Sequence, residues 1–166
     1  MSKSSVSAAF DLEDVAFGSN PGCWPLPPAA TPHELWLRAV AAGGQGHYGT
    51  AQSDLGQLQR LAASGPSAAN APLASLALGT RASFLRQLGW HDRARSLDGQ
   101  ALTLANGLAA PSADALIGLA ADALGVGRFA ASARALLNAA ELVTDSAAAR
   151  LPVRFAWVSA ELAMVT

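Results

Sequence analysis

A short pattern recurs three times in this chain of 166 residues and limits its fold more than any other feature. Each copy has a helix-forming run, a glycine, an aromatic residue or histidine two positions later, and then small residues and leucines at helical spacing. Glycine tolerates the positive φ that commonly ends a helix, and small side chains allow two helices to pack closely. The pattern therefore predicts helical hairpins. The glycines are Gly46, Gly89 and Gly127, the residues two positions later are Tyr48, His91 and Phe129, and the small residues five positions later are Ala51, Ala94 and Ser132.

The rest of the chain also favours helices. It is rich in alanine and leucine and poor in the β-branched and aromatic residues typical of strands. Thr31, Pro32 and Glu34 have the order of an N-cap, a proline in the first turn and an acidic first turn. We expect an all-α fold of about seven helices, over residues 32–43, 47–63, 70–88, 91–106, 112–125, 128–144 and 150–164.

The first 31 residues differ in composition from the helical part of the chain. Pro21, Pro25, Pro27 and Pro28 lie within eight residues, and prolines at this density stop helices and cannot pair inside a sheet. We therefore expect two parts: a Pro-rich, flexible, extended arm over residues 1–31 and a helical domain over residues 32–166.

The three copies resemble the tetratricopeptide repeat (TPR), which has a glycine at the turn between antiparallel helices, an aromatic residue two positions later and alanines on the second helix. The best match is RASFLRQLGWHDRARSLDGQAL, residues 81–102. The glycines are 43 and 38 residues apart, further than the family's repeat of about 34. A loop around Pro66 and a turn containing Pro111 fit the excess. The resemblance implies antiparallel hairpins stacked as a right-handed superhelix.

The same resemblance implies a function. TPR arrays are non-catalytic interaction or adaptor modules, and their stacked hairpins present a concave groove to a peptide or protein partner. The family's geometry implies that the groove would draw on Trp36, Leu37, Val40, Leu76, Thr80, Ser83, Arg86, Gln87, Asp114 and Ile117. The alternative is a small-molecule sensor or regulatory domain with an apolar pocket between its helices. An open groove would favour the first function and a closed apolar cavity the second.

No set of residues predicts catalysis, a metal or a cofactor. Cys23 lies among prolines with no base beside it in the sequence. His33, His47 and His91 lie in separate segments without metal-ligand spacing, and His91 stands where the repeat places a packing aromatic. We expect a protein that is not an enzyme, with no catalytic residues, no metal and no cofactor.

The charges limit the partners. Eleven basic and twelve acidic residues give a net charge of −1, without the positive field that attracts nucleic acid or anionic membranes. The first residues lack the pattern of a secretory signal, and prolines interrupt the longest uncharged stretch. We therefore expect no nucleic-acid partner, no membrane and a cytoplasmic location. The arginines near the second hairpin, Arg81, Arg86, Arg93 and Arg95, have two open interpretations: solvated ion pairs with Asp92 and Asp98, or contacts to a partner's carboxylate.

Two acidic residues are expected at helix starts. Asp92, and Asp114 together with Ser112, should lie in first turns, where they would compensate the helix dipole.

The last helix, LPVRFAWVSAELAMVT, is apolar around much of its circumference. One side can cover the preceding hairpin, and the other would then remain exposed, which soluble monomers generally avoid. A two-fold dimer that buries this helix, or the N-terminal arm folding back over it, would cover that side. Of the two we expect the homodimer, because symmetric pairs are the commonest oligomers, with an interface that includes Phe155, Trp157, Val158 and Leu162.

Overall fold

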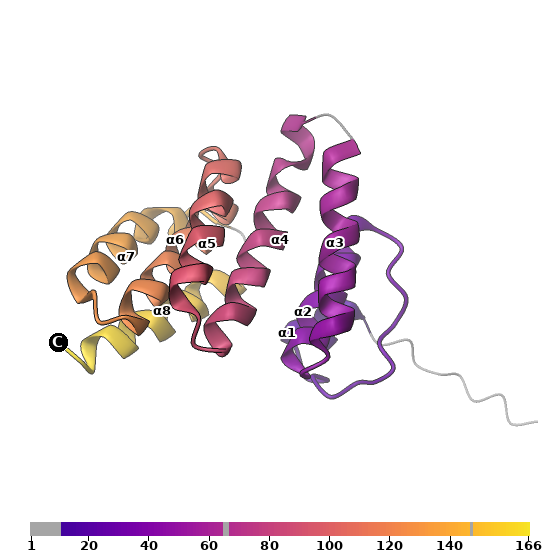
Figure 1. The fold of residues 1–166 in the computed structure, drawn as a ribbon, viewed down its shortest axis with the longest axis horizontal. Coiled ribbons are helices and arrows are strands. Elements are labelled where there is room, and N and C mark those ends of the chain that lie inside the picture. Colours follow the sequence, from indigo (N-terminus) through magenta and orange to yellow (C-terminus); the bar gives the residue numbers. More distant parts are fainter. Residues whose placement is uncertain (1–10, 65–66, 147) are drawn as a thin grey trace, which may run out of the picture. The chain divides into compact units, whose positions relative to one another are not determined.

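The computed structural model describes residues 11–64, 67–146 and 148–166, and these contain eight helices and no strand (Figure 1). The expected all-α class is therefore confirmed for the described residues. The helices are α1 Leu12–Phe17, α2 Pro32–Gly44, α3 Tyr48–Ser64, α4 Ser67–Gln87, α5 His91–Ala105, α6 Ala109–Gly125, α7 Phe129–Thr144 and α8 Arg150–Ala163. The chain divides into two compact units, one ending at Asp54 and one beginning at Leu55, so that the boundary falls within α3.

Each of the seven expected helices corresponds to one of α2 to α8. The largest differences are at the starts of α4 and α6, which begin three residues earlier than expected. In α6 the reason is Pro111, which does not delay the helix but lies in its first turn, where its missing N–H removes no helical hydrogen bond. The earlier start also makes Asp114 the sixth residue of α6, so its expected place in the first turn is wrong, whereas Asp92 does lie in the first turn of α5.

The three glycine turns have one geometry. Gly46, Gly89 and Gly127 have φ values of 81°, 78° and 73°, and the residue after each donates its backbone N–H to a carbonyl five positions earlier, at 2.8–2.9 Å. This is the six-residue hydrogen bond that closes a helix ending in a left-handed residue. The expected positive φ at Gly89 and Gly127, just after helix ends, is confirmed.

The first unit holds the unexpected helix, α1, inside the segment expected to be extended. Asp11 caps it by accepting a hydrogen bond from the Glu13 N–H, and Leu12 and Val15 are buried where α1 packs on α2. The expectation of an extended chain is therefore wrong for residues 12–17. The prolines begin four residues after this helix ends, so they do not interrupt it. The expected start of α2 is confirmed as a capping box between Thr31 and Glu34. The expected boundary at residue 31 stays a prediction.

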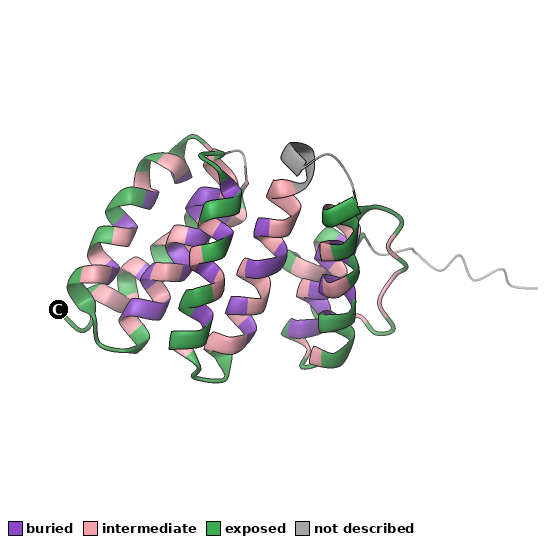
Figure 2. Cartoon of the chain, turned by 45° about the horizontal axis from the view of Figure 1, so that its top comes forward, coloured by how far each residue is buried: buried purple, intermediate pink, exposed green. Residues whose placement is uncertain are grey.

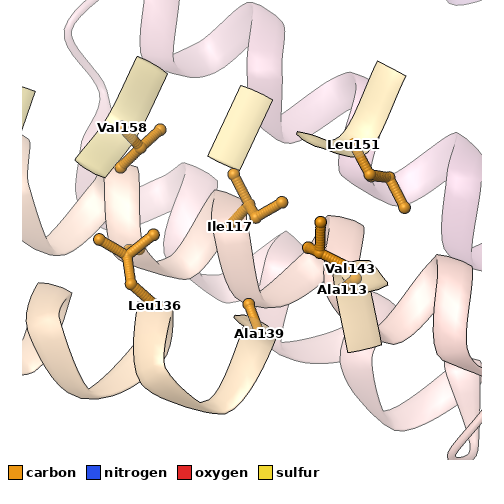
Figure 3. Close-up of a cluster of buried hydrophobic side chains, with 8 residues drawn as sticks. Ala113, Ile117, Leu136, Ala139, Val143, Leu151 and Val158 are labelled. Atoms are coloured by element: carbon orange, nitrogen blue, oxygen red, sulfur yellow. The ribbon is translucent and has the colours of Figure 1, made fainter. Parts of the chain in front are cut away.

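The second unit contains α4 to α8. Neighbouring helices pack in sequence order, and α6 also packs on α4 as α8 packs on α6. Figure 2 shows that buried residues line the sides on which these helices meet. A buried apolar cluster joins α6, α7 and α8 around Ile117, Leu136, Val143, Leu151 and Val158 (Figure 3).

Candidate functional site

Two features of the second unit are candidates for a functional site: a cluster of buried charges and an apolar groove. The buried charge cluster centres on Arg86 of α4, Asp98 of α5 and Asp122 of α6. Arg86 Nη1 lies 2.5 Å from Asp98 Oδ2, 2.9 Å from Asp122 Oδ1 and 3.2 Å from the carbonyl oxygen of Gly118. Both aspartates are only 1% exposed. A single guanidinium nitrogen thus serves two buried carboxyl groups from two different helices.

A glycine on the facing helix α6 provides the room for Asp98, whereas a Cβ atom at Gly79 of α4 would make only ordinary contacts. A Cβ atom at Gly118 would overlap the Asp98 carboxyl group. A Cβ atom at Gly79 would lie 3.8 Å from Asp98 Oδ1 and 3.7 Å from Asp114 Oδ2. The cluster therefore depends on glycine at position 118 of α6, because a side chain there would displace the Asp98 carboxyl group.

Asp114 extends the charged region to α8. Arg150 Nη1 lies 2.8 Å from Asp114 Oδ1, and Arg154 Nη1 contacts the same oxygen. In total, three arginines face three aspartates on α4, α5, α6 and α8. The formal charges of these six side chains balance only when all three carboxyl groups are ionised.

Burial governs the titration of the aspartate pair. Burial raises the pKa of Asp98 to about 7, and it outweighs the lowering effect of Arg86. Burial also raises the pKa of Asp122, where Arg86 and a hydrogen bond from Asp98 act in the opposite direction. Because burial raises the pKa of both groups, the pair keeps its last proton to a higher pH than two exposed aspartates would.

His91 lies at the edge of this cluster, beside Gly125. Its Nδ1 is 4.0 Å from Asp122 Oδ1, too far for a hydrogen bond. Among the described residues, neither His91 Nδ1 nor Asp122 Oδ2 has a hydrogen-bond partner. His91 is therefore a packing residue, as expected, but the hydrogen bond expected for a buried histidine is missing at Nδ1.

The apolar groove lies between α7 and α8 and has a volume of about 400 Å³. It is open to solvent, and Leu137 at its edge is 74% exposed. The groove is lined by Ala133, Leu136, Leu137 and Ala140 of α7 and by Phe155, Ser159, Leu162, Ala163 and Thr166 of α8 and the C-terminus. It offers almost no hydrogen-bonding groups, so it suits an apolar surface better than a polar ligand.

The residues expected in a concave groove lie in different surroundings. Trp36, Leu37 and Ile117 are buried, and Gln87 is exposed. Arg86 and Asp114 belong to the charged region already described. Arg86 does pair with Asp98, as one of the two interpretations of the arginines expected, but the pair is buried and not solvated. The remaining four, each partly buried, are Val40, Leu76, Thr80 and Ser83.

Two other arginines of that group, Arg81 and Arg93, also have local contacts. Arg81 donates to Gln59 Oε1 at 2.6 Å, and the Arg93 guanidinium lies over the Trp90 ring, 4.8 Å from its centre. Both guanidinium groups thus have contacts within the chain. The geometry gives no support to the interpretation that these two arginines bind a partner's carboxylate.

The residues expected at a dimer interface separate into two groups. Val158 is buried in the core, and Phe155 and Leu162 line the groove, whereas Trp157 is exposed on the opposite side of α8. The sequence correctly shows that α8 has two apolar faces, but it does not show which of them meets α6 and α7.

The cysteine and the histidines of the first unit have local packing roles. The Trp24 ring stacks on His47 with centroids 3.8 Å apart, and Gln45 Nε2 donates to the Cys23 carbonyl oxygen at 3.2 Å. His33 lies against Trp36 and faces Glu13. Within the described part of the chain, no three histidine, cysteine, aspartate or glutamate side chains are grouped so that they could hold a metal ion.

Comparisons with known proteins give no family for this chain. No protein-family model, no curated protein and no solved structure matches it. Among the described helices, none is both long and apolar enough to cross a membrane. The function must therefore be argued from the groove and the charge cluster themselves.

Proposed function

We propose that this protein is a non-catalytic interaction module, an adaptor that binds an amphipathic helix of a partner protein in the groove between α7 and α8. The supporting observation is the groove itself, which is open, about 400 Å³ in volume and lined almost entirely by apolar side chains. Amphipathic helices commonly bind in such grooves, with anchor residues at helical spacing.

The order of the helices favours a helix as the occupant. In the second unit α5 pairs with α4 and α7 pairs with α6, while α8 packs on α6 and α7 as α6 packs on α4 and α5. The helices of this unit thus bind one another through apolar faces, and the groove offers a partner helix a surface of the same kind.

The broader proposal keeps the TPR-like superhelix implied by the sequence pattern. The repeated glycine turns and the alternating helix contacts support it. In this proposal the protein acts in the cytoplasm. The superhelix would also present a second, concave surface that includes Thr80, Ser83 and Gln87, which are at least partly exposed.

A small apolar molecule is the second candidate occupant. The volume lies within the range of about 300–1,000 Å³ typical of small-molecule sites, and the lining is apolar. The openness of the groove argues against this candidate, because such sites enclose most of their ligand. Native mass spectrometry of the chain purified from its host would show a bound molecule of a few hundred daltons if this second function were the correct one.

The main proposal can be tested by site-specific crosslinking. A photoreactive phenylalanine analogue at Leu137, in the groove, should capture a partner in the native host, and the same analogue at Asn138, exposed on α7 but not lining the groove, should not. An amphipathic peptide from the captured protein should then bind the purified chain. Leu137→Glu should weaken that binding by about 30-fold or more, as expected for a central anchor, while Asn138→Glu should have little effect. Equal capture at both positions, or equal effects of both substitutions, would contradict the proposal.

A further inference from the structure

The outer side of α8 carries a second apolar surface, separate from the groove. Val153, Trp157 and Met164 are 69%, 66% and 78% exposed, and Ala160 is exposed between them. Their spacing of four, three and four residues is the spacing that places side chains on one stripe of a helix. We call these four residues the outer stripe of α8.

Each charged residue of α8 has a hydrogen-bond or ion-pair partner. Arg150 and Arg154 are paired with Asp114 of α6, and Glu161 accepts a hydrogen bond from Trp157 Nε1 at 2.7 Å. These are the three charged residues of Arg150–Ala163, all of which the structure describes. The arginines of α8 therefore have a partner on α6, and Glu161 is the charged group that borders the outer stripe.

We propose that the outer stripe is a self-association surface, on which the α8 helices of two copies of this chain pack antiparallel about a two-fold axis. In antiparallel helix pairs with this spacing, each a position of one helix faces a d position of the other. Val153 would then face Met164 of the second copy, and Trp157 would face Ala160 of the second copy. A large side chain meets a small one at the centre, so the stripe is complementary to itself.

The size of the stripe sets the strength of the pair. Two helices that contribute four core positions each bury less than the roughly 1,200 Å² typical of stable complexes, which places this pair among weak, concentration-dependent dimers. Trp157 is the expected hot spot, because tryptophan dominates binding energy at the centre of small interfaces.

The dimer is independent of the proposed binding function. The groove uses Phe155, Ser159 and Leu162, which lie on the opposite side of α8 from Trp157. Two copies could therefore pair through their outer stripes while both grooves remain open, and the adaptor would then be bivalent. Failure of one proposal leaves the other standing.

Sedimentation equilibrium of the full chain tests the proposal. The parent should change from one chain of 16.8 kDa to two as its concentration is raised to about 100 µM, a range chosen for weak dimers. Trp157→Glu should raise the dimer dissociation constant by about 30-fold or more, and Ala160→Arg should do the same by blocking the closest approach. Trp90→Glu, which changes an exposed tryptophan outside α8, is the matched control and should leave association unchanged. A parent that stays monomeric, or two tryptophan variants that associate equally, would overturn the proposal.

Disulfide trapping tests the direction of the pair. In a Cys23→Ser background, a mixture of Val153→Cys and Met164→Cys chains should form crosslinked dimers on mild oxidation in much higher yield than either variant alone. A parallel pair would instead crosslink each variant to itself, and that outcome would overturn the antiparallel arrangement. Circular dichroism of each variant checks that the fold is retained.

Discussion

The two units bury aspartate side chains in opposite ways. In the first unit one guanidinium serves one carboxylate: Arg38 Nε and Nη2 lie 2.9 and 2.7 Å from the two oxygens of Asp54. In the second unit a single nitrogen of Arg86 serves both Asp98 and Asp122. The first arrangement satisfies its carboxylate with a two-point contact, whereas the second leaves two carboxyl groups short of donors.

This difference shows how a buried cluster can remain stable without one cation for each acid. Where donors are too few, burial raises the pKa of both carboxyl groups, and protonation of one of them removes one buried charge. The cluster around Arg86 therefore depends on pH as well as on geometry. The two sites also differ in reach, since Arg38 joins α2 and α3 whereas Arg86 joins α4, α5 and α6.

The largest expected effect is that of removing the shared cation. Arg86→Leu leaves Asp98 and Asp122 buried without a positive partner, and breaking a buried ion pair in this way costs about 4 kcal/mol of unfolding free energy. Arg38→Leu leaves one buried carboxylate whose cation was partly exposed, and should cost about 2 kcal/mol. Urea denaturation of both variants measures the difference. Equal losses of unfolding free energy would show that leaving a second buried carboxyl group without its cation has no additional cost.

The next effect is on the pH dependence of stability. The pKa of Asp98 is about 7 in the folded chain, above the ordinary value of 3.8, so the folded state keeps a proton that the unfolded state loses between these values. Its contribution to stability is therefore fully present below about pH 4 and is lost as the pH rises to about 7.

Asp98→Asn removes this titration while keeping the shape of the side chain. Between pH 5 and pH 8 the stability of the variant relative to the parent should rise by about 2 kcal/mol, because only the parent loses the contribution of Asp98. Thermal or urea unfolding of both chains at several pH values measures this change. A constant difference between the two chains across this range would show that Asp98 is already ionised in the folded chain at pH 5.

Most of the helices could be predicted from the sequence, because glycine turns and amphipathic spacing are local signals. The exception is α1, a six-residue helix next to a proline-rich segment. Its signal lies in Asp11 as a cap and in Leu12 and Val15 one turn apart. Prolines that come after a short helix do not prevent it from forming.

The charge cluster was harder to predict, because its members come together only in the fold. Arg86 is 12 residues from Asp98 and 36 from Asp122. One local signal existed: Asp98 lies on the same face of α5 as the buried Ala94 and Ala101, where an acid is unusual. The sequence does not show which arginine would reach it, since that depends on the packing of α4 against α5 and α6.

The smallest expected effect tests the space that glycine leaves for the shared pair. Gly118→Ala would place a Cβ atom on the Asp98 carboxyl group and move it away from Arg86. The displacement should cost about 2 kcal/mol, and the better helix propensity of alanine returns about 1 kcal/mol, for a net loss near 1 kcal/mol. Gly99→Ala in α5 is the matched control, because no atom lies within 4 Å of its added Cβ, and it should gain about 0.5–1 kcal/mol. Urea denaturation at pH 6 compares the two substitutions. If both were stabilising, the Asp98 carboxyl group could move without loss, and its contact with Arg86 would not be the constraint that distinguishes the second unit from the first.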